Sequence, residues 1–76
     1  MRELIELLTR ELVAHPEEVE VREVDGPEGV TLEIYVSPDD TGKVIGRSGR
    51  IISALRTVAK AAAVREGRRV FVEVMA

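Results

Sequence analysis

The fold of this chain is decided by residues 42–52, which read GKVIGRSGRII. Two glycines, Gly46 and Gly49, stand three residues apart between two apolar pairs. Gly46 predicts the end of a short helix, and Gly49 lets the chain turn directly into a longer one, since glycine adopts left-handed backbone geometry without steric cost. The first amides of that second helix have no partner within it and carry the positive end of its dipole. The loop is therefore predicted to receive an anion, and a phosphate fits this chemistry.

Basic side chains surround this predicted loop, although the formal net charge of the chain is −3. Residues 1–40 hold twelve acidic and three basic side chains, a net charge of −9, and residues 41–76 hold eight basic and two acidic ones, a net charge of +6. Because the local field governs where a polyanion docks, this division allows nucleic-acid binding, with an affinity that the acidic half keeps modest. The basic residues in or beside the loop are Lys43, Arg47 and Arg50.

The elements before the loop follow from the spacing of apolar residues. Residues 2–14 have the pattern of an amphipathic helix, which Pro16 ends. Residues 19–24 predict a first strand, whose alternation slips at its last residue, so a bulge or an early end is expected there. A five-residue turn at 25–29 leads to the clearest strand, residues 30–36, where every second side chain is apolar.

The elements around and after the loop complete the domain. A short helix is predicted over residues 37–45, with Ser37 as its cap, and a long one over residues 50–66. Residues 69–75 form the last strand. Each strand has one apolar face, so three helices must cover one side of a three-stranded sheet. The first two strands are expected to be antiparallel, and the last, reached through a helical crossover, parallel to residues 30–36. The sequence predicts a mixed-sheet α+β fold in the order α-β-β-α-α-β.

Composition excludes several classes of protein. Seventy-six residues suit one domain, spanning 1–76, and the absence of cysteine removes disulfides and thiol chemistry. His15, the only histidine, cannot make a metal cluster unaided and is expected to face solvent at a helix end. With no nucleophile–base pair, we expect neither an enzyme nor a cofactor or metal. Neither Gly-x-Gly-x-x-Gly nor a P-loop run is present, which argues against a nucleotide-binding enzyme. No apolar run is long enough for a membrane span, and the N-terminus lacks a signal-peptide core, so a cytoplasmic protein without membrane contact is expected.

Residues 44–52, VIGRSGRII, resemble the signature of the K-homology (KH) domain, in which an apolar pair, Gly-x-x-Gly and an apolar residue two places on follow one another. The predicted element order, with its extra helix and strand at the N-terminus, is similar to the type II form common in bacteria. The domain fills the chain, and this compactness, with EEVEV at 17–21 upstream and RTVAKAAA at 56–63 downstream, is similar to the small stand-alone bacterial KH proteins of the KhpA type. The resemblance implies single-stranded RNA binding, in which the loop clamps the sugar-phosphate backbone of about four nucleotides while the bases lie in an adjoining groove.

Carried onto this chain, the resemblance implies that the backbone amides of the loop meet phosphates, with Lys43 and Arg50 adding charge from either side. The loop residues are Gly46, Arg47, Ser48 and Gly49. Candidates for the apolar wall of the base groove are Val44, Ile45, Ile51 and the edge strand 30–36 with Leu32 and Ile34. The sequence does not separate residues that touch bases from residues of the core, and for Ile45 and Ile51 a core position is favoured. The resemblance also implies self-association or pairing with a second KH protein, and a role as an RNA chaperone or post-transcriptional regulator.

Two features outside the loop have more than one interpretation. Arg56 and Lys60 share an outer ridge of the long helix, which either touches RNA at its periphery or only faces water. Tyr35 and Phe71 point to the sheet face away from the helices, as isolated exposed aromatics or as a contact patch for a dimer or another partner. The rival to RNA binding is a protein-interaction module whose loop is a relic. Salt dependence separates the two, since phosphate contacts weaken steeply with salt.

Overall fold

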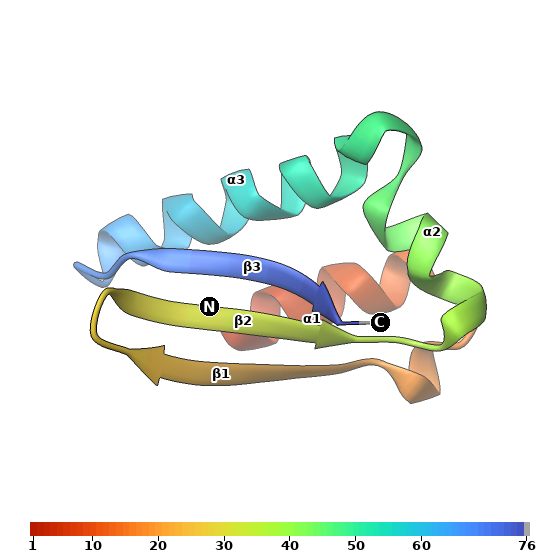
Figure 1. Ribbon diagram of the computed structural model, residues 1–76, viewed down its shortest axis with the longest axis horizontal. Helices are drawn as coiled ribbons and strands as arrows, with labels where there is room; N and C mark the ends of the chain where they lie inside the picture. The colour runs from red at the N-terminus through yellow and green to blue at the C-terminus, as the bar shows by residue number, and fades with distance from the viewer. Residues whose placement is uncertain (76) are drawn as a thin grey trace.

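The computed structural model describes residues 1–75 and contains one three-stranded sheet and three α-helices. Figure 1 shows the helices on one side of the sheet, with α3 running beside β3, and the other face of the sheet left open. This arrangement confirms the predicted α+β architecture and its order. The elements are α1 (Arg2–Leu12), β1 (Glu20–Gly26), β2 (Gly29–Tyr35), α2 (Thr41–Ile45), α3 (Arg50–Arg65) and β3 (Val70–Met75), with 3-10 turns at Pro16–Glu18, Pro38–Asp40 and Arg47–Gly49.

The strand order is β1-β2-β3, with β1 antiparallel and β3 parallel to β2. Both predicted pairings are confirmed. One expectation was wrong: residues 30–36 are not an edge strand, because β2 pairs on both sides and occupies the centre of the sheet. The free edges belong to β1 and β3. Of the two edge strands in the described residues, β3 is the one beside α3 (Figure 1).

The hairpin between β1 and β2 is tighter than the predicted five-residue turn. Gly26 pairs with Gly29, so only two residues lie between the strands. Gly29 has φ +147°, and an added Cβ would lie 2.5 Å from the carbonyl oxygen of Arg69, so this position needs glycine. The expected bulge or early end is also absent from β1, since Val24 pairs with Thr31 in unbroken register and faces the open side. The alternation slips because Glu23 is exposed although its partner Leu32 is buried on the helix side, which shows that the helices do not cover this end of β1.

The core lies between the sheet and the helices. The buried stripe of α3 consists of Ile52, Leu55, Ala59 and Ala63, and its two alanines allow close approach to the sheet. The buried apolar set is Ile5, Val19, Val21, Val30, Leu32, Ile34, Val44, Ile52, Leu55, Ala59, Ala63, Val70 and Val72. The one buried hydroxyl of α1, on Thr9, donates to the carbonyl oxygen of Ile5 at 2.7 Å, so it enters the core with a partner.

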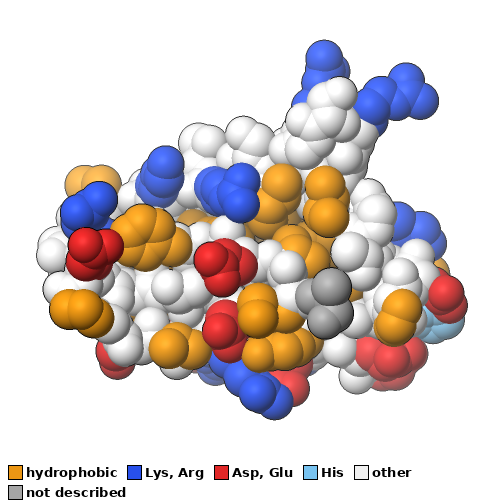
Figure 2. All heavy atoms as spheres, in the orientation of Figure 1, with side chains coloured by type: hydrophobic (Ala, Val, Ile, Leu, Met, Phe, Trp, Pro, Cys, Tyr) orange, Lys and Arg blue, Asp and Glu red, His pale blue; other side chains and the backbone are white. Residues whose placement is uncertain are grey.

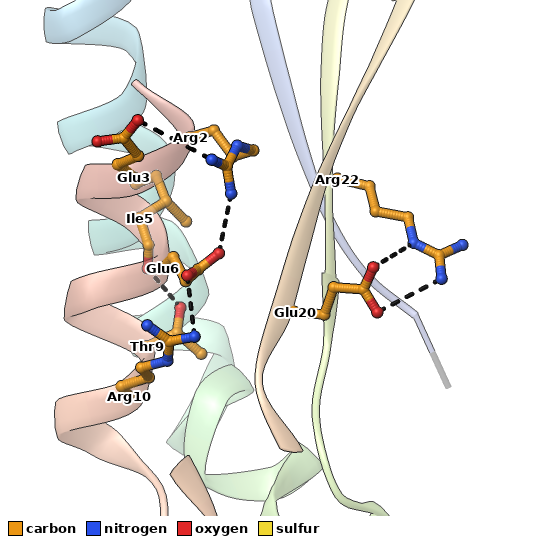
Figure 3. A network of polar contacts seen from close by, with 8 residues as sticks. All are labelled: Arg2, Glu3, Ile5, Glu6, Thr9, Arg10, Glu20 and Arg22. Carbon is orange, nitrogen blue, oxygen red and sulfur yellow. Dashed lines mark hydrogen bonds and ion pairs between the residues drawn. The ribbon is translucent and has the colours of Figure 1, made fainter. Parts of the chain in front are cut away.

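Ion pairs in the acidic half of the chain lie on α1 and β1. Glu6 accepts from Arg2 at 3.0 Å and from Arg10 at 2.9 Å, one helical turn away on either side (Figure 3). Glu20 pairs with Arg22 at 2.8 Å on the open face of the sheet. These pairs involve all three arginines of residues 1–40, Arg2, Arg10 and Arg22.

One buried carboxylate joins the end of α1 to the start of α2. Asp40 has no exposed surface, and its two oxygens accept from the amides of Ala14 at 3.0 Å and His15 at 2.9 Å. Lys43 lies 3.4 Å from the same carboxylate. Burial by itself raises the pKa of Asp40, but the two amides and then Lys43 outweigh it and hold that pKa below its ordinary value. Sequence reasoning placed Asp40 only at the favourable end of a helix dipole and missed this contact, because its partners lie 25 and 26 residues away.

Candidate nucleic-acid interface

The predicted loop is a 3-10 turn between α2 and α3, at residues 47–49. Gly46 ends α2, as predicted, with φ 77° and ψ 170°, and Gly49 precedes α3 in left-handed geometry with φ 72°. Ser48, between them, also has a positive φ of 57° and is the only described residue other than glycine that does. The backbone therefore changes from helical geometry at Arg47 to left-handed geometry at Ser48, an arrangement in which successive amides converge on an anion.

The loop amides are not equally available. Gly46 donates to the carbonyl of Gly42 at 2.9 Å, and Gly49 donates to the carbonyl of Gly46 at 3.1 Å. The expectation that all four loop residues offer amides to a phosphate is thus too broad, because the 3-10 turn and the end of α2 already use these two. Among the hydrogen bonds of residues 1–75, none uses the amide of Arg47 or Ser48. These two amides are the ones free to meet an anion.

Gly46 has a steric reason to be glycine that Gly49 lacks. A Cβ on Gly46 would lie 2.4 Å from Cγ1 of Ile51, whereas a Cβ on Gly49 would be 3.8 Å from its nearest neighbour, Ile52. Ile51 therefore packs directly under the start of the loop and holds it against α3. The φ and ψ of Gly46 also fall in a region that side chains disfavour strongly.

We expect Gly46→Ala to lower the free energy of unfolding by about 3 kcal/mol, the sum of backbone strain and overpacking against Ile51. Urea denaturation followed by circular dichroism measures this. The control is Gly42→Ala, where the added Cβ meets nothing within 4 Å inside a helix, and it should be neutral or stabilising by up to ~1 kcal/mol. Equal stabilities for the two variants would contradict the close approach at Gly46.

The cations near the loop divide into two kinds. Arg47 and Arg50 are exposed, and neither forms an ion pair within residues 1–75. Lys43 was predicted to add charge to the loop, but its ammonium is paired with the buried Asp40, which draws it toward the end of α1. Figure 2 shows basic side chains projecting from the top of the molecule, where the α2–α3 loop lies. The free positive charge at the loop is that of two guanidinium groups.

Burial separates the apolar candidates for a base groove. Val44, Leu32 and Ile34 have no exposed surface, so they belong to the core and present nothing to a base. The favoured core position of Ile45 is wrong, because this side chain is 38% exposed, and Ile51 is half-buried. The difference arises because the one turn of α2 packs only Val44 inward. Ile45 and Ile51 are thus the apolar residues beside the loop that a base could touch.

A hollow runs between α3 and the free edge of β3. Arg56 donates through Nε to the carbonyl of Val72 at 3.2 Å, which ties the ridge of α3 to the sheet edge. Arg56 and Lys60 both line this hollow, so they do more than face water. The hollow is lined by Arg56, Lys60, Val70, Phe71, Val72 and Glu73.

Tyr35 and Phe71 do not form one patch on the open face. Phe71 pairs with Thr31, four residues before Tyr35 on β2, a separation of about 13 Å along the strand. Tyr35 is occupied, since it donates to Glu33 at 2.9 Å and the guanidinium of Arg22 lies 4.7 Å from its ring centroid. The hydrogen bond to Glu33, with burial as the next cause, raises the pKa of Tyr35. Figure 2 shows the hydrophobic atoms of this face in separate patches with acidic side chains between them.

One group of side chains has metal-ligand spacing, which sequence reasoning did not foresee for the lone histidine. Ligand atoms of His15, Glu17 and Glu18 lie within 4.8 Å of one another at the surface, and exposed acidic groups commonly gather in this way without an ion. His15 also lies 3.8 Å from Asp39. Within residues 1–75, no helix is long and apolar enough to cross a membrane.

The geometry defines the class of this protein. A Gly-x-x-Gly loop joins two helices, an apolar residue lies beneath it, and a mixed three-stranded sheet packs against three helices in the order α-β-β-α-α-β. These are the features of a KH domain of type II.

Comparison with known proteins places the chain within that class. The family model described as KhpA/KhpB, KH domain, matches residues 2–74. The chain is 53% identical to the RNA-binding protein KhpA of Clostridium perfringens and 52% identical to that of Clostridium acetobutylicum, in each case over 99% of this chain and 100% of the relative. It is 47% identical, with the same coverage, to the RNA-binding protein KhpA of Caldanaerobacter subterraneus. The chain belongs to the KhpA/KhpB KH-domain family.

Proposed function

We propose that this chain binds single-stranded RNA through the 46–49 loop and catalyses no reaction. The observation that carries the proposal is the loop tip, where the free amides of Arg47 and Ser48 stand beside the unpaired guanidinium groups of Arg47 and Arg50. Amides and guanidinium groups together donate charge-assisted hydrogen bonds to phosphate oxygens. The names of the relatives, RNA-binding protein KhpA, support RNA as the source of that phosphate.

The RNA strand is proposed to leave the loop along α3. Ile45 offers apolar surface beside the loop, and Arg56 and Lys60 line the hollow against the free edge of β3, whereas Ile51 lies on the side of α3 that faces α1. Residues 41–65 contain six basic and no acidic side chains, so the helical side of this path attracts the RNA backbone, although Glu73 of β3 also lines the hollow. Acidic residues on α1 and β1 limit attachment elsewhere. A protein that holds RNA by its backbone in this way suits the role of an RNA chaperone or post-transcriptional regulator in the cytoplasm.

A fluorescence-anisotropy titration of labelled mixed-sequence single-stranded RNA at low and high salt tests the proposal. The affinity should fall steeply with salt, because each phosphate contact releases counterions. Binding that ignores salt, or no binding at all, would favour the rival interpretation as a protein-interaction module.

We also propose that the chain self-associates, or pairs with a second KH protein, through α1 and α3. The open face does not support this role, because Tyr35 and Phe71 lie apart. Between the two helices, however, lies a hollow whose surface is almost wholly apolar. It is lined by Leu8, Glu11, Leu12, Ile51, Ala54, Leu55 and Val58. Burial of this strip against a second copy removes apolar area from water.

The variant Ala54→Glu tests this interface, because it places a charge in the strip at an exposed position. Sedimentation velocity should show wild-type particles of about twice the chain mass of 8.4 kDa and the variant at the chain mass. RNA affinity at the loop should change little in the variant. If wild type sediments as a monomer and a tagged second KH protein does not bind it either, the strip is not an interface.

A further inference from the structure

A second hollow lies at the end of α3 that is remote from the loop. It is continuous with the hollow described above, since Lys60, Val70 and Phe71 line both. No acidic residue lines it, whereas three basic ones do. The lining residues are Lys60, Ala63, Val64, Arg68, Arg69, Val70 and Phe71.

Phe71 gives this hollow an aromatic surface. Phe71 is the second residue of the edge strand β3, and its side chain is 41% exposed. It lines the hollow together with residues of α3. The guanidinium carbon of Arg69 lies 5.7 Å from the ring centroid, within the range of a cation–π contact. An exposed ring beside a guanidinium group is the combination on which bases stack in single-stranded nucleic-acid sites.

One of the three basic residues of this hollow is engaged in an ion pair, and the other two are not. Arg68 forms an ion pair with Asp25 of the β1–β2 hairpin, which anchors the segment between α3 and β3. Arg69 and Lys60 form no ion pair within the described part of the chain and remain available to a phosphate. The hollow therefore offers one aromatic ring and two free cations.

We infer that this hollow takes a nucleobase of the same RNA strand that the loop holds, with the base stacked on Phe71 and the neighbouring phosphates on Arg69 and Lys60. The inference rests on the proposed function. The 16 residues of α3 span about 24 Å, so the strand must extend past the segment held by the loop to occupy both ends. RNA suits this lining because it supplies both a base for the exposed ring and phosphates for the basic side chains beside it.

The length of the RNA separates this site from the loop. Affinity is measured for an oligonucleotide of about four nucleotides, which the loop can hold alone, and for one about three times as long. We expect Phe71→Ala and Phe71→Leu to weaken binding of the long RNA about tenfold and to leave the short RNA unchanged, because stacking needs the ring. The control Val24→Ala removes another exposed apolar side chain from the same row of the open face and should change neither affinity.

Phe71→Trp supplies a direct signal, since the chain contains no tryptophan. Its fluorescence should be quenched by the long RNA and not by the short one, with the wild-type affinity retained. Unchanged affinity for the long RNA in Phe71→Ala, while loop substitutions abolish binding, would overturn this inference and leave the proposed function standing. Loss of self-association in Phe71→Ala with RNA affinity intact would likewise overturn it and assign the ring to a protein contact. Failure of the loop substitutions to affect either RNA would instead contradict the proposed function.

Discussion

Substitution of Arg47 and Ser48 together by aspartate is expected to weaken single-stranded RNA binding at least a hundredfold while the domain stays folded. The change removes one of the two free guanidinium groups and sets two carboxylates beside the two free amides, where the phosphate is proposed to lie. Loss of charge-assisted hydrogen bonds and like-charge repulsion then act together. Both side chains are exposed, so circular dichroism and thermal denaturation should remain close to those of the wild type.

The control must match the change in net charge, because any added negative charge weakens binding to a polyanion. Leu7→Asp with Arg10→Asp makes the same change on exposed positions of α1. Its affinity should stay within about threefold of wild type in physiological salt, where charges beyond a Debye length are screened. Anisotropy titrations of all three proteins give the comparison. Equal losses in both variants would mean that the overall field, and not the loop, holds the RNA.

Removal of the Asp40 carboxylate is expected to destabilise the fold strongly and to leave the backbone geometry of the loop untouched. Asp40→Ala removes the acceptor of the amides of Ala14 and His15 and, with it, the contact that joins the segment after α1 to the start of α2. We expect the midpoint of thermal denaturation to fall by roughly 10 °C or more for a domain of this size. The neighbouring Asp39→Ala serves as the control, because that carboxylate is 83% exposed, and its midpoint should change little.

Acid should erase part of this stabilisation. The pKa of Asp40 is lowered in the folded chain, so the carboxylate stabilises the fold above its unfolded pKa of about 3.9, and this contribution is lost as the pH falls through the folded pKa. The variant Asp40→Asn has no carboxylate, so this position does not titrate in the variant. The difference in thermal midpoint between wild type and Asp40→Asn should therefore be constant near neutrality and shrink below about pH 4. A difference that is constant down to lower pH would show that the charge of Asp40 contributes nothing.

Most of the fold could be predicted from the sequence because its signals are local. Alternation of apolar residues over 30–36 and the helical spacing over 50–66 each depend on neighbours within a few residues. The pairing directions followed from the lengths of the connections. The prediction failed where the context was not local: Glu23 could be polar because no helix covers that end of β1, and the turn is shorter than predicted because Gly26 and Gly29 pair across the strands.

The candidate site was predicted less completely than the fold. Spacing of Gly46 and Gly49 located the loop, but which amides remain free depends on the 3-10 turn that the chain makes there. Lys43 was assigned to the loop because of its position, and the structure shows it beside Asp40. No local pattern could have separated exposed Ile45 from buried Val44, since adjacent apolar residues on one helical turn differ only in what packs against them.

The sequence by itself determined the order of the elements, the place of the loop between two helices, and the division of charge between the halves of the chain. Backbone propensity and side-chain periodicity act over a single turn or strand, so they can be recognised in the sequence without knowing which residues pack against one another. Only the tertiary structure decided which groups are left over for a ligand. It paired Asp40 with amides 25 and 26 residues away, separated Tyr35 from Phe71, and set Phe71 beside the end of α3. Those outcomes depend on how the layers pack, because a polar or aromatic group is free for binding only when no neighbour in space has already satisfied or covered it.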